Sequence, residues 1–216
     1  MPEPFAVKDC ALIAIATGRH ARNLRELAGY LSEVPLGSIY HHFWGGRLHT
    51  QFDEPEFQND FAGWVRHALH DEALSERLGM LDPTRVSDLE ALRVELLDIL
   101  DESLNSLENP PWAQADQPFS FVRSQLVIFD TQHRIAEPAG LKDIAPGFTV
   151  GTIFYHFIDA RRRRPEGIDD FRGWLLDFGE EYKSLIDQLA AIDPYFRSLA
   201  ELKDRLSTVF QTYFGG

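Results

Sequence analysis

Histidines gather in the first half of the chain, where six of the eight lie: His20, His41, His42, His49, His67 and His70. Several carboxylates follow the adjacent pair His41 and His42, namely Asp53, Glu54, Glu56 and Asp60. Imidazole with carboxylate is a ligand set that zinc, iron and manganese accept. His67 and His70 are three residues apart, which predicts one shared helix face. The spacing matches neither HExxH nor a histidine–cysteine finger. Two interpretations stay open: a divalent-metal site built from His41, His42, His67 and His70, or scattered surface histidines.

One histidine has a counterpart in the second half, because SIYHHF (38–43) resembles TIFYHF (152–157) and pairs His42 with His156. The two imidazoles could face each other across a twofold axis and bind a ligand or act as a pH switch. Alternatively, each is a half-buried ring bonded to a backbone carbonyl, which helps its helix to pack. The ligand hypothesis places a site around His42, Tyr40, Arg19, Asp60 and Trp64, with His156 and Trp174 as counterparts.

Trp64 and Trp174 each follow an aspartate, Asp60 or Asp170, by four residues. The aspartates could cap helices while the indoles fill the core, or the indoles could form a platform for a sugar or a partner side chain. The glycines just before them, Gly63 and Gly173, indicate a close approach by a neighbouring helix or a ligand. The run Arg161–Arg164 is either a clamp for a phosphate or an acidic partner, or a solvated helix end.

The chain reads as an internal duplication, because residues 4–43 align without gaps on residues 118–157. Asp60–Trp64 then matches Asp170–Trp174, and Leu81-Asp82-Pro83 matches Ile192-Asp193-Pro194. Nine aligned positions are identical: Pro4/Pro118, Phe5/Phe119, Leu12/Leu126, Thr17/Thr131, Leu27/Leu141, Gly37/Gly151, Ile39/Ile153, His42/His156 and Phe43/Phe157. The polar stretch 105–117 carries Pro110-Pro111 and is typical of a linker. We therefore predict a first repeat over 1–104 and a second over 118–216.

Each half opens on an apolar run, LIAIAT (12–17) or LVIFDT (126–131), which favours a buried strand without excluding a helix. Helical patterns follow. Asn23 is a plausible N-cap for the first, and the second-half copy must be shorter because of Pro138 and Pro146. Ser38 or Thr152 is expected to cap the next helix, Asn59-Asp60 or Asp169-Asp170 the one after, and Ser87 or Ser198 the last. The fold class is therefore mainly α, or α+β with one short strand per repeat. We expect the two repeats to pack as a pseudo-twofold internal dimer, with the strands able to pair.

The composition excludes several functions. With 21 Lys and Arg against 34 Asp and Glu, the net charge of −13 disfavours nucleic acid and anionic membranes. The single cysteine, Cys10, can form neither an internal disulfide nor a thiolate metal cage and is expected to pack in the core. No GxSxG, GxxxxGK[ST] or GxGxxG motif occurs. The N-terminus lacks a signal-peptide pattern, and no apolar run is long enough to span a membrane, which favours a cytoplasmic protein.

Five first-half pieces together resemble a bacterial family described only as a domain of unknown function: TGR (17–19), NLREL (23–27), SIYHHF, NDFAGW (59–64) and LDP (81–83). The resemblance covers most of residues 4–104, with a more diverged copy over 118–214. It implies a bacterial origin and an internally duplicated helical domain, and no activity. The second copy reads Thr131-Gln132-His133 and Glu137–Gly140 where the first has TGR and NLRE. Any function of those two pieces would therefore remain with the first half.

Three functions remain possible. We favour a non-catalytic binding or regulatory module that recognises a protein or small ligand at the junction of the repeats. On this hypothesis the protein uses no cofactor and could form a homodimer. The alternatives are a metal-dependent helical enzyme that uses first-half histidines and a divalent metal, and a structural or scaffolding protein whose repeated residues are all core.

Overall fold

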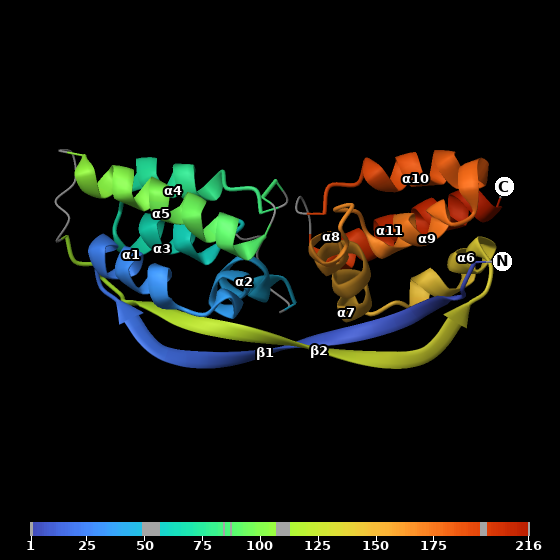
Figure 1. Cartoon of the computed structure of the whole chain (residues 1–216), viewed down its shortest axis with the longest axis horizontal. Helices are drawn as coiled ribbons and strands as arrows, with labels where there is room; N and C mark the ends of the chain where they lie inside the picture. Colours follow the sequence, from blue (N-terminus) through green and yellow to red (C-terminus); the bar gives the residue numbers. More distant parts are fainter. Residues whose placement is uncertain are drawn as a thin grey trace. The chain divides into compact units, whose positions relative to one another are not determined.

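The computed structural model describes residues 2–48, 57–83, 85–86, 88–106, 113–194 and 198–215, and it is mainly helical (Figure 1). Its described strands, β1 (Phe5–Ala21) and β2 (Phe119–Ile135), pair as a two-stranded antiparallel sheet. Each strand has 17 residues, so the expectation of one short strand per half was wrong in length. The alternation of apolar and polar residues begins well before the predicted runs, at Phe5 and Phe119, and the strands begin there too.

The apolar runs that predicted the strands are not their buried parts. Side chains are buried near the start of each strand, at Phe5, Val7, Phe119 and Phe121. Further along, about half of the surface is exposed at Ile13 (50%), Ile128 (46%) and Phe129 (51%). The prediction of strand conformation was confirmed, whereas the prediction that these runs are buried was wrong, because helices cover the strand starts instead.

The chain forms two compact units. Unit 1 comprises Met1–Ala11 and Leu126–Gly216, and unit 2 comprises Leu12–Gln125. Each strand therefore passes from one unit into the other, and the start of β1 packs with helices that come late in the chain (Figure 1). This division differs from the sequence repeats 1–104 and 118–216. Residues 107–112 of the expected linker lie outside the described residues.

Unit 2 contains the helices that follow β1. They are α1 (Leu24–Glu33), α2 (Leu36–Trp44), the 3-10 turn η1 (Gly45–Leu48), α3 (Asp60–Ala68), α4 (Glu72–Gly79) and α5 (Leu89–Asn105). Leu27, Leu31, Leu92 and Leu96 are fully buried on α1 and α5, as their helical spacing predicts.

Unit 1 contains several short helices after β2 and a long last helix. They are α6 (Leu141–Ile144), α7 (Val150–Ile153), the π-helical segment η4 (Phe154–Asp159), α8 (Ala160–Arg163), α9 (Asp170–Leu176), α10 (Lys183–Ala190) and α11 (Leu199–Gly215). Three 3-10 turns accompany them, at Pro138–Gly140, Ala145–Gly147 and Gly179–Tyr182. Two of those turns contain Pro138 and Pro146, which confirms the prediction of a shortened helix there.

Helix caps follow the sequence in most places. The side chains of Asn23, Asn59 and Asp169 accept the expected backbone N–H bonds, and Ser198 with Glu201 forms the expected capping box. Ser38 and Thr152 were wrong as caps, because α2 begins after Pro35 and Thr149 caps α7. Ser87 lies outside the described residues, and Asp88 caps α5.

No helix in the described part of the chain is both long enough and apolar enough to cross a bilayer.

Candidate functional site

His42 lies inside unit 2 and uses both ring nitrogens. Its Nδ1 is 2.8 Å from Asp60 Oδ2 at the start of α3, and its Nε2 accepts the Val122 N–H of β2 at 3.2 Å. The side chain is only 3% exposed. The imidazole therefore joins three elements: α2, which carries it, α3 and β2.

His156 makes the same set of contacts inside unit 1. Its Nδ1 is 2.8 Å from Asp170 Oδ2, and its Nε2 accepts the Lys8 N–H of β1 at 2.9 Å. Burial lowers its pKa below 6.5, although the bond to Asp170 acts in the opposite direction. Burial alone would raise the pKa of Asp170, but His156 and Arg163 outweigh it, and the pKa of Asp170 is lowered. The pair is thus a neutral imidazole beside an ionised carboxylate.

These contacts determine which ring nitrogen carries the proton. A backbone N–H can only donate, so Nε2 of each histidine must be the acceptor. The proton of the neutral ring then lies on Nδ1 and is donated to the aspartate. Neither nitrogen retains a lone pair for another ligand. The expected partner, a backbone carbonyl, was wrong for both rings.

Each histidine also lies against an aromatic residue from the start of a strand. Phe119 lies 4.7 Å from the His42 ring and 5.1 Å from Phe61, measured between ring centroids. In unit 1, Phe5 lies 4.8 Å from the His156 ring and 5.2 Å from Phe171. The identity of Phe5 and Phe119 between the halves was the sequence signal for these packing residues.

The tryptophans complete the two clusters. Trp64 Nε1 donates to Gln117 O at 2.7 Å, and Trp174 Nε1 donates to Glu3 O at 2.8 Å. Both carbonyls lie two residues before a repeated phenylalanine. Trp174 is buried, whereas Trp64 is partly exposed. The aspartates beside them bind histidine and do not cap, because Asn59 and Asp169 are the caps.

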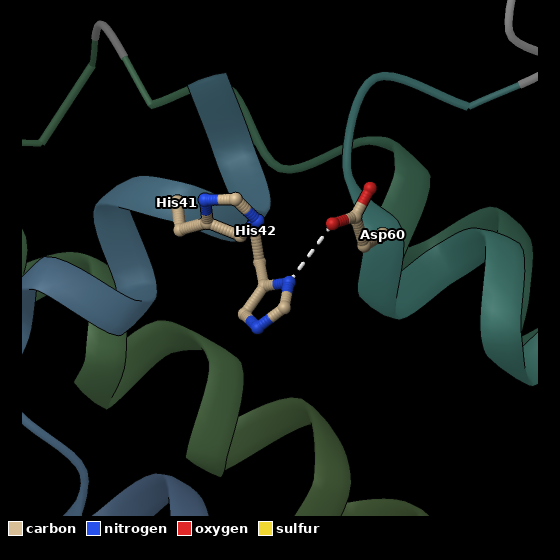
Figure 2. A group of neighbouring side chains, drawn as sticks. All are labelled: His41, His42 and Asp60. Carbon is tan, nitrogen blue, oxygen red and sulfur yellow. Dashed lines mark hydrogen bonds and ion pairs between the residues drawn. The ribbon is translucent and has the colours of Figure 1, made fainter. Parts of the chain in front are cut away.

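His41, His42 and Asp60 form the group that comes nearest to a metal site in the described part of the chain. One ligand atom from each lies within 4.8 Å of the others (Figure 2). His41 Nδ1 is 2.6 Å from Ser124 Oγ. The dashed line in Figure 2 is the His42–Asp60 bond. A metal on His42 Nδ1 would move the proton to Nε2, where it would point at the Val122 N–H. The geometry therefore disfavours metal binding at this ring.

The other predicted histidine pair does not form. Helix α3 ends at Ala68, and His70 lies beyond it with a φ of 59°. His70 Nε2 is 2.6 Å from Asp116 Oδ2 on the surface. His67 and His70 therefore do not share a helix face, and neither belongs to the His41 group. His49, Asp53, Glu54 and Glu56 lie outside the described residues.

Arg19 and Tyr40 make other contacts. Arg19 Nη1 is 2.6 Å from Glu33 Oε2, and the guanidinium lies over the Tyr30 ring. Tyr40 stacks on Trp44 with ring centroids 5.1 Å apart. Of the predicted ligand residues in the first half, the structure brings together His42, Asp60 and Trp64 around Phe119.

The run Arg161–Arg164 surrounds aspartates. Arg163 bridges Asp159 at 2.8 Å and Asp170 at 2.9 Å, and Arg162 also reaches Asp159. Two further pairs, Arg161 and Arg172 with the fully buried Asp169, extend the network. The arginines therefore neutralise buried carboxylates, which neither prediction for this run described. The sequence predicted a close approach by a helix or a ligand at Gly173, whereas the structure places the Arg164 guanidinium there, where a Cβ would collide with it. A Cβ added at Gly63 would meet no described atom within 4 Å outside its own stretch of helix, so no close approach is found there.

These features define a mainly helical protein in which each unit holds a strand segment with a buried histidine that is bonded to an aspartate. The chain belongs to a family of unknown function, DUF5752, whose model matches residues 2–211. This match confirms the resemblance to a family of unknown function.

The solved structure of OrfY from Thermoproteus tenax is similar to this chain. The TM-score is 0.82, with 27% identity over 100% of this chain and 99% of that chain. A comparison with curated proteins found no match.

Proposed function

We propose that the protein is a non-catalytic, cytoplasmic binding module made of two duplicated helical repeats, which recognises a protein or small ligand. The duplication is supported by contacts that recur at aligned positions. Thr17 Oγ1 donates to Phe121 O and Thr131 Oγ1 to Val7 O, each at 2.6 Å. The histidine and tryptophan contacts repeat in the same way.

One observation carries the non-catalytic assignment. The imidazole and indole nitrogens of both histidine clusters are all bonded within the protein, and each aspartate is bonded to its histidine, with the Asp60 side chain 53% exposed. A general base or metal ligand needs a lone pair that faces a substrate or ion. The repeated residues are therefore assigned to holding the strands, and recognition is assigned to another surface.

The strands supply a suitable surface. Phe129 on β2 is 51% exposed, and its neighbour Ile128, on the opposite face of the strand, is 46% exposed. A half-exposed aromatic ring on one face of a strand is a contact that a partner can cover. We assign recognition to this stretch of β2 within unit 1.

A metal-dependent enzyme is the second candidate, favoured by the His41, His42 and Asp60 group. It requires the His42 ring to change tautomer and lose the Val122 bond. A purely scaffolding protein is the third, and it predicts that surface substitutions on β2 change nothing.

The test compares Phe129→Ser with Leu176→Ser, a matched change at a side chain exposed to 52% on α9. Each variant replaces the chain in its own cell and is cross-linked, and the captured proteins and small molecules are quantified against wild type. We expect Phe129→Ser to lose a specific partner that Leu176→Ser keeps, with both melting temperatures unchanged. Identical capture by both variants would contradict the assignment to β2. Stoichiometric metal in untagged protein, lost in His41→Ala, would support the enzyme instead.

A further inference from the structure

We propose that unit 1 contains a strand-docking site that can accept residues 3–10 from a second copy of this chain, which yields a strand-exchanged dimer. The site is defined by Thr131, Gly151, His156, Phe171 and Trp174, all of which lie in unit 1. In the structure, the chain's own residues 3–10 occupy it.

The docking site forms three hydrogen bonds with the backbone of the segment. Trp174 Nε1 donates to Glu3 O at 2.8 Å, Thr131 Oγ1 donates to Val7 O at 2.6 Å, and the Lys8 N–H donates to His156 Nε2 at 2.9 Å. A further contact joins Cys10 Sγ to Gly151 O at 3.2 Å. These bonds require an extended segment in one register, which is how added strands are recognised.

Side chains supply the specificity. The Phe5 ring lies within 5.3 Å of His156, Phe171 and Trp174, measured between centroids. Phe5 is 6% exposed and Val7 is 4% exposed. The site therefore selects an aromatic residue followed, two positions later, by a second apolar residue.

The covalent chain does not tie this segment to unit 1. The polypeptide leaves unit 1 at Ala11 and returns at Leu126, and everything between belongs to unit 2. The segment is held only by contacts that an identical segment can replace. Exchange of an identical segment between two copies gives a dimer with little loss of free energy, because each contact is replaced by the same contact from the other copy. The chain's own segment competes at a high effective concentration, so exchange needs high protein concentration or a weakened internal segment.

The chain itself carries the recognised pattern, which is why we commit to a second copy as the occupant. The equivalent place in unit 2 holds a segment that also begins Pro-Phe, with Trp64 bonded to Gln117 O and His42 to the Val122 N–H. The same pattern of contacts thus recurs in each unit.

The first experiment uses the full-length Phe5→Glu chain, whose own segment carries a charge into the aromatic contact. A fluorescein-labelled peptide of residues 2–11 is titrated against it and followed by anisotropy. We expect saturable binding, at least tenfold weaker for a peptide carrying Phe5→Ala. Adding His156→Leu to the chain should weaken binding by a similar factor, whereas the matched His42→Leu should not. Equal binding of the two peptides, or indifference to His156→Leu, would overturn the proposal.

A second experiment does not depend on the folding of that variant. Concentrated wild-type protein is held just below its melting midpoint, cooled and separated by gel filtration. We expect a new species of twice the starting mass, and its formation should be suppressed by excess peptide 2–11 and not by the Phe5→Ala peptide. Failure to form this species, or equal suppression by both peptides, would show that a second copy does not occupy the site.

Discussion

A methyl group at position 151 has no room in unit 1. Gly151 lies in α7 against β1, and a Cβ there would fall well inside van der Waals contact with Cys10 O and Asp9 Oδ1. The Asp9 carboxylate can rotate, but the Cys10 carbonyl belongs to the strand backbone. Gly151→Ala must therefore push α7 away from β1.

The expected change in the free energy of unfolding of Gly151→Ala follows from two opposing effects. Overpacking in a well-packed interior costs about 1–3 kcal/mol. Replacing glycine by alanine in a helix returns at most about 1 kcal/mol. We expect a net loss of roughly 1–2 kcal/mol, which for a chain of this size lowers the melting temperature by about 2–8 °C.

Two other glycines provide matched controls. Gly37, aligned with Gly151, would place its Cβ 3.0 Å from Ser124 O, so the clash is milder and Gly37→Ala should be close to neutral. Gly29 is exposed in the middle of α1, where an added Cβ would meet no described atom within 4 Å outside its own stretch of helix, and Gly29→Ala should gain about 0.5–1 kcal/mol. Calorimetry of the three variants and hydrogen exchange of the Lys8 amide measure the effects. A Gly151→Ala protein as stable as Gly29→Ala would refute the reasoning.

Three further predictions concern the histidine clusters. Burial lowers the pKa of His156, so the unfolded chain binds a proton at a higher pH than the folded protein does. The free energy of unfolding should therefore be at its full value above pH ~6.5 and should fall as the pH drops toward the lower pKa of the folded state. Urea unfolding from pH 8 to pH 5 should show this decline, with a smaller one in His156→Gln. Trp174→Phe should cost about 0.5–1.5 kcal/mol, because the part-buried hydrogen bond to Glu3 O is lost, and Trp64→Phe should cost less, because its bond to Gln117 O is exposed, as measured by urea unfolding. The melting temperature should be unaffected by chelator in wild type and His41→Ala alike, and a chelator-dependent drop in wild type alone would contradict the tautomer argument.

The sequence predicted the helices well where the pattern was local. Asn23, Asn59 and Asp169 precede apolar residues at helical spacing, and a cap acts within one turn. Ser38 failed as a cap although its residue type was suitable. Its hydroxyl donates instead to Val122 O, a bond to a residue far along the chain. A local sequence pattern does not reveal that a distant backbone carbonyl competes for the hydroxyl.

The sequence predicted several residues of the candidate site and did not predict the contacts that they make. Repetition singled out His42, His156, Trp64 and Trp174, and each does lie in a repeated cluster. Their partners are backbone groups of strand residues such as Lys8 and Val122, which have no side-chain signature. The burial of the strands was missed for a related reason, because periodicity identifies an apolar face without saying which helices cover it.

The division of residues between the units has a consequence for biosynthesis. Residues 3–10 are translated well before Phe171 and Trp174, which enclose Phe5. At about 5–20 residues per second, the strand start waits roughly 10–30 s for those side chains. Unit 2 can close once Gln125 has emerged, and during that interval the nascent chain carries a finished unit beside an orphaned Phe-x-Val segment. Unit 1 therefore cannot close before α9 has been translated, and in a chain truncated before α9 this segment has no place to dock.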